Sequence, residues 1–547
     1  PPSPLPSHLT PLCISNMLIY IVWILVLLVA LVLYHRKTYS RFSKYDVKHF
    51  APAPLLGNLA DVMLRKKHIV EQFDDLFYSF PEEKFVGRYE FVSPVLFIRD
   101  IDLVKKITVK DFEYFIDHRA LVDGEMDPLF GRNLFLLRSQ EWKDMRSTLS
   151  PAFTSSKMRA MVPFMLEVGD MMMGYLREEI KKSGGYVDLD CRDLTSRYAN
   201  DVIASCAFGL KVNSHIEPHN EFYNVGKETA TFGFRSVLVF LGYASFPGLM
   251  KSLGVKLLSE KTDSFFRKII LNTMTDREKK NITRQDMIYL LMKAKKGNLT
   301  YDENSVEENN AGFATVEESL IGQRTVNRDW ADDDLVAQAV LFFIAGFETV
   351  STAMSFLLYE LAVNPEIQER LAQEIKDHDV KTGGKFDYNS IQNMTYLDMV
   401  ISEVLRLWPP AVGLGRECAR NYNIGKPNSK STKDYIIRRG DSVILPVWQF
   451  HHNPEYFPNP NKFDPERFSE QNKHNIQPMT YIPFGAGPRN CIGSRFALCE
   501  IKVMTYQLLQ QIQVSPCDKT QIPAEIARNA FTLKIQGGHW LRFKLRD

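Results

Sequence analysis

Phe484-Gly485-Ala486-Gly487-Pro488-Arg489-Asn490-Cys491-Ile492-Gly493 is the most informative stretch of this sequence. Of the seven cysteines, Cys491 alone lies in a glycine-rich turn with an arginine close by. Glycines at 485 and 487 allow backbone conformations closed to other residues and leave room for a flat ligand. A helical run follows from Phe496, and a cysteine at a helix N-terminus is favoured as a thiolate. We therefore interpret Cys491 as a metal ligand; the alternative is a buried, inert cysteine beside a tight turn.

Size and composition are those of a folded protein with a large core. The chain has 547 residues, 45% of them hydrophobic and 24% charged. A formal net charge of +2 gives no indication of nucleic-acid binding. The cysteines are odd in number and widely spaced, and no C-x-x-C occurs, which argues against disulfides or a zinc site and indicates a reducing compartment.

The amino-terminal part contains a predicted membrane anchor. Residues 17–34 form an unbroken apolar run, and a helix of that length would span about 27 Å, close to the hydrocarbon thickness of a bilayer. Lys and Arg follow this run and neither precedes it, so the positive-inside rule places the later chain in the cytosol. A cleaved signal peptide is the alternative, but its apolar region would be shorter and its basic residues would come first. We hypothesise that 1–16 is a non-native leader.

The remaining chain is predicted to be one mainly α domain with small β-sheets. Residues 35–60, basic and proline-containing, are expected to form a linker or an ordinary loop before a domain at 61–547. A polar stretch at 295–328 predicts a flexible surface insertion. Helical patterns dominate, and short strands are predicted at 85–89, 95–98, 435–437 and 442–446.

The clearest helix runs from Trp330 to Val363, and its centre is apolar on nearly every side, which indicates burial. Gly346, Glu348 and Thr349 interrupt that centre, although glycine there costs about 1 kcal/mol relative to alanine. Oxygen chemistry explains all three: Gly346 lets water or O2 approach the backbone, Thr349 can hydrogen-bond oxygen, and Glu348 can relay protons. The alternative is a kink whose threonine bonds its own backbone.

Two further helical patterns carry polar pairs. Trp142 and Arg146 stand four residues apart, so both can donate to one carboxylate, although a packed tryptophan and a solvated arginine would look the same. Glu403 and Arg406 stand three apart, and Arg467 follows later in the chain. We expect these three to form a buried structural cluster.

The pattern F-x-x-G-x-x-x-C-x-G resembles the haem-binding loop of the cytochrome P-450 monooxygenases. Four more motifs of that family occur in its order: W-x-x-x-R at 142–146, A-G-x-[ED]-T at 345–349, E-x-x-R at 403–406 and P-E-R-F at 465–468. The resemblance covers roughly residues 50–547. It looks closest to the microsomal branch that holds insect families 6 and 9 and vertebrate family 3.

The resemblance implies a cytochrome P-450 fold that binds haem b, with the Cys491 thiolate as axial ligand. In the family, a lid over the substrate matches residues 210–259. The residues expected to hold the cofactor are Trp142, Arg146, Arg416 and Arg489 at the propionates, His118 as a further propionate contact, and Phe484 and Gly493 in the loop. The expected catalytic residues are Thr349, Glu348 and Gly346.

The resemblance also implies a monooxygenase of the endoplasmic reticulum that acts on lipophilic small molecules, including plant toxins and insecticides. Electrons would come from NADPH through a separate flavoprotein reductase, with cytochrome b5 as an optional donor, because no G-x-G-x-x-G follows a strand. A basic surface of Lys143, Lys157, Arg159 and Arg489 could receive the reductase or simply be solvated. A reductase-independent isomerase or dehydratase is the alternative function, although such relatives often lose the helix threonine. A haem sensor or carrier would not need Glu348 and Thr349.

Overall fold

The computed structural model describes residues 11–119, 124, 127–230, 238–239, 242–243, 247–296, 312–324, 329–530 and 532–546. Within these ranges the chain is mainly helical with three small sheets, as predicted. The helices are α1 (Pro11–Thr38), α2 (Arg41–Lys44), α3 (Ala60–Met63), α4 (Ile69–Tyr78), α5 (Ile101–Lys105), α6 (Pro128–Gly131), α7 (Ser139–Leu149), α8 (Ser155–Lys182), α9 (Cys191–Cys206), α10 (Glu221–Ala230), α12 (Pro247–Ser252), α13 (Glu260–Lys280), α14 (Met287–Lys295), α15 (Asp332–Val363), α16 (Pro365–Thr382), α17 (Tyr388–Asn393), α18 (Thr395–Leu407), α19 (Val447–His452) and α20 (Ser494–Gln511).

The largest sheet has the strand order β1 (Phe85–Glu90), β2 (Ser93–Ile98), β7 (Ser442–Leu445) and β4 (Leu414–Glu417). β2 and β7 pair in parallel, and the other pairs are antiparallel. β7 ends one residue earlier than expected, because Pro446 lacks the N–H that a sheet ladder requires. A second sheet contains β3 (Tyr186–Asp190), β9 (Trp540–Leu545) and β8 (Ile512–Ser515), and β5 (Tyr422–Gly425) pairs with β6 (Tyr435–Ile437).

α15 is the central helix of the helical part. It packs against α9, α10, α13, α18 and α20, and most of its side chains beyond the first turn are buried. Asp332 and its two neighbours favour the first turn through the helix dipole, and Pro365 disfavours a helical conformation at Asn364, where the helix ends. α15 is long and apolar enough to cross a membrane, but 61% of its most apolar window is buried inside the protein. It is therefore a core helix.

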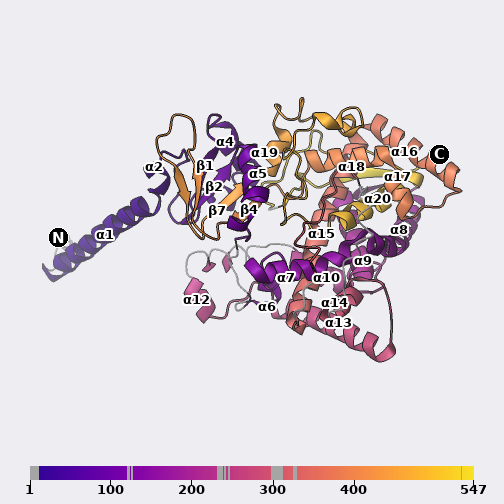
Figure 1. Cartoon of the computed structure of the whole chain (residues 1–547), viewed down its shortest axis with the longest axis horizontal. Coiled ribbons are helices and arrows are strands. Elements are labelled where there is room, and N and C mark those ends of the chain that lie inside the picture. Colours follow the sequence, from indigo (N-terminus) through magenta and orange to yellow (C-terminus); the bar gives the residue numbers. More distant parts are fainter. Residues whose placement is uncertain are drawn as a thin grey trace, which may run out of the picture.

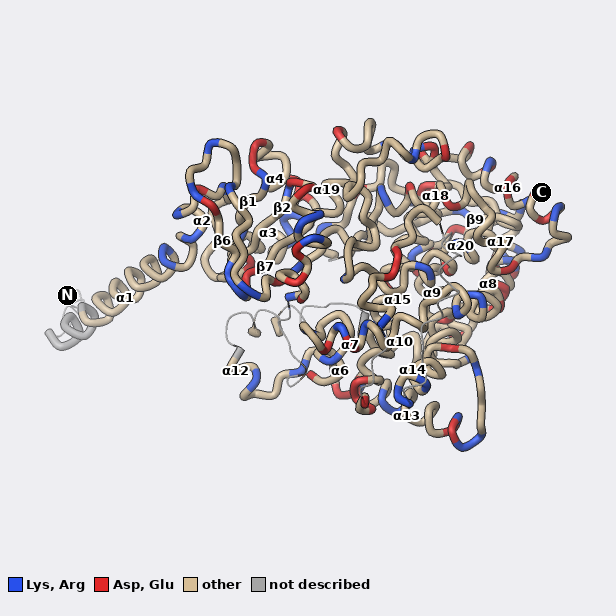
Figure 2. The backbone as a smooth tube through the Cα atoms, in the orientation of Figure 1, with Lys and Arg blue, Asp and Glu red and all other residues tan. Residues whose placement is uncertain are grey.

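α1 is the second helix that could span a membrane. Figure 1 shows it projecting from the sheet-rich side of the body, and its apolar window at Ile19–Thr38 is entirely unburied. In Figure 2, Lys and Arg gather where α1 meets the body. A free apolar helix with a basic end fits a single transmembrane anchor.

The segment at 39–58, expected to be a linker or loop, packs against the sheet. Phe42 is fully buried, and a Cβ on Gly87 would lie 2.5 Å from its ring, so the glycine makes room for this phenylalanine. His49 forms a β-bridge with Gly87. The chain between α1 and the body is thus held in place by packing instead of running as a free tether.

Two other predicted segments extend beyond the described residues. The expected lid at 210–259 contributes the described helices α10 and α12, and its middle lies mostly outside the described ranges. Of the expected flexible insertion at 295–328, the structure describes residues 295–296 and 312–324. Ala314 is buried there, and Glu318 contacts α7, so this part is packed against the body.

Candidate functional site

The cysteine turn and the middle of α15 face each other across a cavity of about 370 Å³. This volume lies within the range of small-molecule sites, about 300–1,000 Å³. The lining is mostly apolar and includes Leu341, Phe342, Val350, Ala411 and Leu414. The structure brings ten of the eleven sequence-predicted site residues to its wall: His118, Trp142, Arg146, Gly346, Thr349, Arg416, Phe484, Arg489, Cys491 and Gly493.

Backbone bonds and glycines shape the cysteine turn. Gly485 and Gly487 have φ values of +78° and +70°, a region that favours glycine. A Cβ on Gly487 would lie 1.8 Å from the carbonyl oxygen of Thr108, so the turn can approach that carbonyl only with glycine. The Cys491 N–H donates to the Phe484 carbonyl at 2.8 Å, which closes the turn. The cysteine is therefore held in a fixed position.

Of the six cysteines whose side chains the structure describes, all after residue 190, Cys491 alone is exposed, and it lines the cavity. Desolvation by the surrounding protein raises the pKa of its thiol, although the Gly493 N–H acts in the opposite direction. α20 begins at Ser494, so Cys491 precedes the helix instead of entering it.

Arg416 places an unpaired cation on the cavity wall. β4 carries this residue, whose side chain is fully buried, and its Nη1 donates to the Gly415 carbonyl at 2.9 Å. Its Nε has no hydrogen-bond partner among the described residues. Burial lowers the pKa of Arg416 to about 10. A buried guanidinium with unused donors calls for an anion, because an uncompensated buried charge is strongly unfavourable.

Arg489 has a different environment. Its guanidinium donates to backbone carbonyls of Ile116, Leu134 and Leu137, and it lies 4.1 Å from the centre of the Trp142 ring. This arginine joins the cysteine turn to the chain before α7. It is buried, so the expectation that it contributes to an exposed basic surface is wrong.

Arg146 is also engaged by protein groups. It donates to both carboxylate oxygens of Glu318, at 3.1 and 2.7 Å, and to the carbonyl and the side-chain oxygen of Asn490, each at 2.8 Å. The Trp142–Arg146 spacing does place both residues at the cavity, as the sequence indicated. The structure adds two partners for the arginine that the spacing could not identify.

His118 lies beside Arg416 at the same wall. Its Nδ1 is 2.9 Å from the Gly415 carbonyl, and its ring stacks on Phe135. Burial and the nearby charges of Arg416 and Arg489 hold the pKa of His118 well below its ordinary value. The imidazole is therefore neutral, and because the Gly415 carbonyl can only accept, Nδ1 carries the proton and Nε2 is an acceptor.

The wall fits a flat, anionic cofactor on two grounds. The unpaired Arg416 supplies a cation for a carboxylate. A Cβ on Gly493 would approach only Phe153, at 3.8 Å, so no protein atom occupies the space beside this glycine. Gly493 lines the cavity, so that space is open to a ligand. Cys491 on the same wall can supply a sulfur ligand to iron. Together these residues fit haem.

On the opposite wall, α15 is unbroken at Gly346 and Thr349. The Thr349 hydroxyl donates to the Ala345 carbonyl at 2.5 Å, as in the backbone-bonding alternative, and the side chain remains exposed to the cavity. A Cβ on Gly346 would lie 3.1 Å from Ile203 Cδ1, so this glycine also permits the close approach of α9. The helix does not open at this point.

Glu348 is the one predicted site residue that is not on the cavity wall. Its Oε1 accepts from Arg192 at 2.6 Å and from the Thr532 hydroxyl at 2.8 Å. A helix turns about 100° per residue, which separates neighbours such as 348 and 349 onto different faces. In this arrangement Glu348 is an ion-pair partner of α9 and does not reach the cavity directly.

The Glu403 cluster forms behind the site as expected. Arg406 donates to both Glu403 oxygens at 2.7 and 2.8 Å, and both side chains are fully buried. Arg467 approaches the same carboxylate at 3.4 Å. This cluster ties α18 to the turn at Pro465–Phe468 and contributes to structure.

Sequence reasoning missed three polar residues around the site: Asn490, Arg192 and Glu318. Asn490 lies inside the opening motif, and its contact with Arg146 depends on folding. Arg192 sits on α9, far in sequence from its partner Glu348. The apolar residues of Phe313-Ala-Thr-Val316, just before Glu318, could have indicated that this part of the insertion is packed, because apolar residues tend to be buried.

Comparison with known proteins gives the same picture. A family model described as "Cytochrome P450" matches residues 48–542. "Cytochrome P450 9e2" of Blattella germanica is 45% identical over 517 residues, which cover 92% of this chain and 94% of the relative. "Probable cytochrome P450 9f2" of Drosophila melanogaster is 40% identical, over 92% of this chain and 95% of the relative. "Cytochrome P450 6k1" of Blattella germanica is 36% identical, over 94% and 95%. The expected likeness to insect families 9 and 6 is confirmed.

Proposed function

This chain belongs to the cytochrome P450 family, and from that premise we propose that it is a haem-thiolate monooxygenase that inserts one atom of O2 into lipophilic small molecules. One observation carries the proposal: Cys491 faces an apolar cavity whose opposite wall bears Gly346 and Thr349. The unpaired Arg416 on the same side as the cysteine supports it. Isomerase and dehydratase relatives often lose the helix threonine, so Thr349 speaks against that alternative.

Haem b, bound through the Cys491 sulfur, would supply the oxygen-activating chemistry. The chain would hold the propionates mainly through Arg416, whose Nε has no partner among the described residues. Trp142 lies at the same cavity and would add a donor to this polar end, which His118 would line beside Arg416. Arg146 and Arg489 would act there chiefly by fixing the turn, because most of their donors already bond to protein.

The α15 wall would control oxygen and protons. Gly346 leaves space beside the backbone, and the Thr349 hydroxyl would turn from the Ala345 carbonyl to donate to oxygen. Glu348 would deliver protons only if its pair with Arg192 rearranged, so we assign it a supporting role. The apolar side chains around them exclude water from the reacting atoms.

The partners that we propose are a separate NADPH-dependent flavoprotein reductase and, as a second donor, cytochrome b5. The substrates would be lipophilic, in keeping with the apolar cavity wall. Xenobiotics, including insecticides, are the substrate class that we propose. α1 would anchor the enzyme in the endoplasmic reticulum membrane, with the catalytic body on the cytosolic side, because basic residues follow the apolar run.

The test is to supply reductase, NADPH and isotopically labelled dioxygen with a panel of lipophilic probes. We expect one labelled oxygen atom in the product and no product when the reductase is omitted. Product formation without reductase, or with oxygen derived only from water, would contradict the proposal and favour the isomerase alternative.

A further inference from the structure

The segment at 312–324, which we call the strap, lies against the outer side of the cysteine turn. It precedes α15 in the chain but contacts α7, the turn and α18. The Ile321 carbonyl accepts from Ser147 at 2.5 Å, and the Phe313 N–H donates to Asp398 at 2.8 Å. The space left between strap and turn is about 10 Å³, room for about one water molecule. The strap therefore lies directly on the turn.

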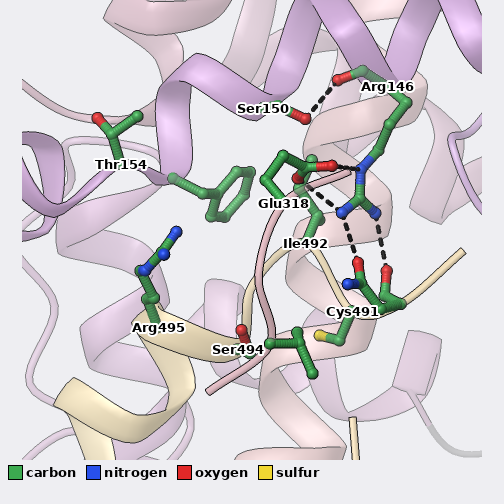
Figure 3. A pocket seen from close by; sticks show the side chains of 11 residues that line it. Arg146, Ser150, Thr154, Glu318, Cys491, Ile492, Ser494 and Arg495 are labelled. Atoms are coloured by element: carbon green, nitrogen blue, oxygen red, sulfur yellow. Dashed lines mark hydrogen bonds and ion pairs between the residues drawn. The ribbon is translucent and has the colours of Figure 1, made fainter. Parts of the chain in front are cut away.

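Glu318 is the strap residue that reaches the site. Figure 3 shows the Arg146 guanidinium between the Glu318 carboxylate and the backbone just before Cys491. Arg146 donates to the carboxylate from Nε and Nη2. It also donates from Nη1 to the Asn490 carbonyl and from Nη2 to the Asn490 side-chain oxygen. Asn490 in turn donates from Nδ2 to the Glu317 carbonyl at 2.8 Å. These bonds form a closed ring of strap, α7 and turn.

The site is built to hold this carboxylate. A Cβ on Gly322 would lie 2.3 Å from Glu318 Oε1 and 2.5 Å from the Ser150 hydroxyl, so a side chain at 322 would have to displace one or both of these groups. The side chains of Arg146 and Glu318 are only 3% and 10% exposed. Bidentate, charge-assisted bonds in such surroundings are strong and directional. Loss of the carboxylate would leave a nearly buried cation without its counter-ion.

We propose that Glu318 is a positioning residue for the cysteine ligand. It orients Arg146, which through Asn490 fixes the backbone that carries Cys491, and its negative charge balances the cation beside the sulfur. This inference rests on the proposed function, because its readouts need bound haem. Glu318 touches neither substrate nor the reacting atoms, and it acts through Arg146.

Three substitutions of Glu318 test its contact with Arg146 and its negative charge. Glu318→Ala removes the carboxylate and frees Arg146, so the red-shifted Soret band of the reduced carbonyl complex should be lost about tenfold faster than in wild type, since one partner of a nearly buried pair is gone. Glu318→Gln keeps much of the shape and removes the charge, so the midpoint reduction potential should shift to a more positive value. Glu318→Asp should restore part of both properties.

Glu317→Gln is the matched control, because it removes the same charge from the exposed neighbouring residue of the strap. It should behave as wild type. Gly322→Ala offers an independent route: residue 318 is kept, but the added methyl group displaces its carboxylate, and band loss should accelerate as in Glu318→Ala. Circular dichroism shows whether each variant is folded, and Glu318→Gln still decides the matter if Glu318→Ala fails to fold.

The outcomes are distinguishable. A wild-type protein without a red-shifted band would overturn the proposed function itself. A normal wild-type band, with Glu318→Gln and Gly322→Ala indistinguishable from Glu317→Gln in band lifetime and potential, would overturn the positioning role alone.

Discussion

At the scale of single residues, two polar side chains on the cavity wall differ in their hydrogen bonds: Arg416 has an unused donor, and the Thr349 hydroxyl is already bonded. Arg416 is fully buried, and its Nε has no partner among the described residues. Thr349 faces the cavity but satisfies its hydroxyl on the Ala345 carbonyl. The arginine is therefore poised for an anion at all times, whereas the threonine can serve the cavity by exchanging one acceptor for another.

Replacement of Arg416 by methionine should weaken haem retention. Methionine keeps an unbranched, flexible stem but lacks the guanidinium, so one charge-assisted contact disappears, worth about 2 kcal/mol or roughly thirtyfold in affinity. The measurement is haem content per chain after gel filtration. Arg439→Met, at an exposed arginine, is the control. Equal haem content in both variants would remove Arg416 from the propionate site.

Replacement of Thr349 by alanine should separate function from stability. The free energy of unfolding should stay within about 0.5 kcal/mol, because the helix carbonyl keeps its backbone partner. Product formed per NADPH consumed should fall at least about tenfold if the hydroxyl directs protons to oxygen. Thr505→Ala on α20, whose hydroxyl bonds the Ile501 carbonyl in the same way, is the control. An unchanged product yield for Thr349→Ala would refute the assigned role.

At the scale of elements, α15 both lines the cavity and forms an ion pair with α9. The sequence predicted the first of these roles. The burial of its centre followed from the apolar pattern, and Gly346 and Thr349 reached the cavity as expected. The partner of Glu348 could not be predicted, because helical spacing gives the face of a residue but not the distant side chain that meets it. Arg192 on α9 is that side chain.

The far end of α15 also predicts a pH effect. Desolvation raises the pKa of Glu360 from 4.5 to about 7, although Trp408 Nε1 donates to its carboxyl at 2.7 Å. The folded protein keeps this proton at pH values where the unfolded chain has lost it, so stability should fall as pH rises between about 4.5 and 7. Glu360→Gln should abolish that fall, on the order of 3 kcal/mol.

Urea unfolding midpoints at about pH 5 and about pH 8 would check this linkage. The exposed Glu366→Gln serves as control and should follow wild type. A Glu360→Gln protein whose midpoint still falls with pH as steeply as that of wild type would show that other groups cause the loss.

At the scale of the whole molecule, the anchor and the body are joined by packed chain. α1 projects from the body, but Phe42 behind it is fully buried against Gly87. The linker was predicted from prolines and basic residues. Such local features do not show which distant strand will pack against the segment. Long-range packing of this kind also explains the strap, whose polar composition suggested a solvated insertion.

Truncation tests this division. Deletion of residues 1–34 should move the protein from the membrane to the soluble fraction with its haem spectrum intact. Phe42→Ala in the same truncated protein should lower the free energy of unfolding by about 3–5 kcal/mol, as expected for a buried phenylalanine. Leu55→Ala, at an exposed apolar residue nearby, is the control. Equal stability of both variants would mean that the segment is a linker after all.

The motifs of the site were predictable because each depends on local spacing, and the five of them occur in one order along the chain. Local patterns could not assign the roles that depend on distant partners. Arg489, expected at the propionates and also on a basic surface, is buried among backbone carbonyls, and Arg146 is shared with Glu318. Both differences arise because a guanidinium has several donors, and only the fold determines which acceptors it meets.

The central claim is that the Cys491 sulfur binds haem iron, and the reduced carbonyl spectrum tests it most directly. The wild-type protein and a Cys517→Ala control, altered at a partly exposed cysteine, should both show the red-shifted Soret band of thiolate ligation. Cys491→Ala should lose that band. A Cys491→Ala protein that retains it, or a haem-loaded wild-type protein that lacks it, would contradict the account.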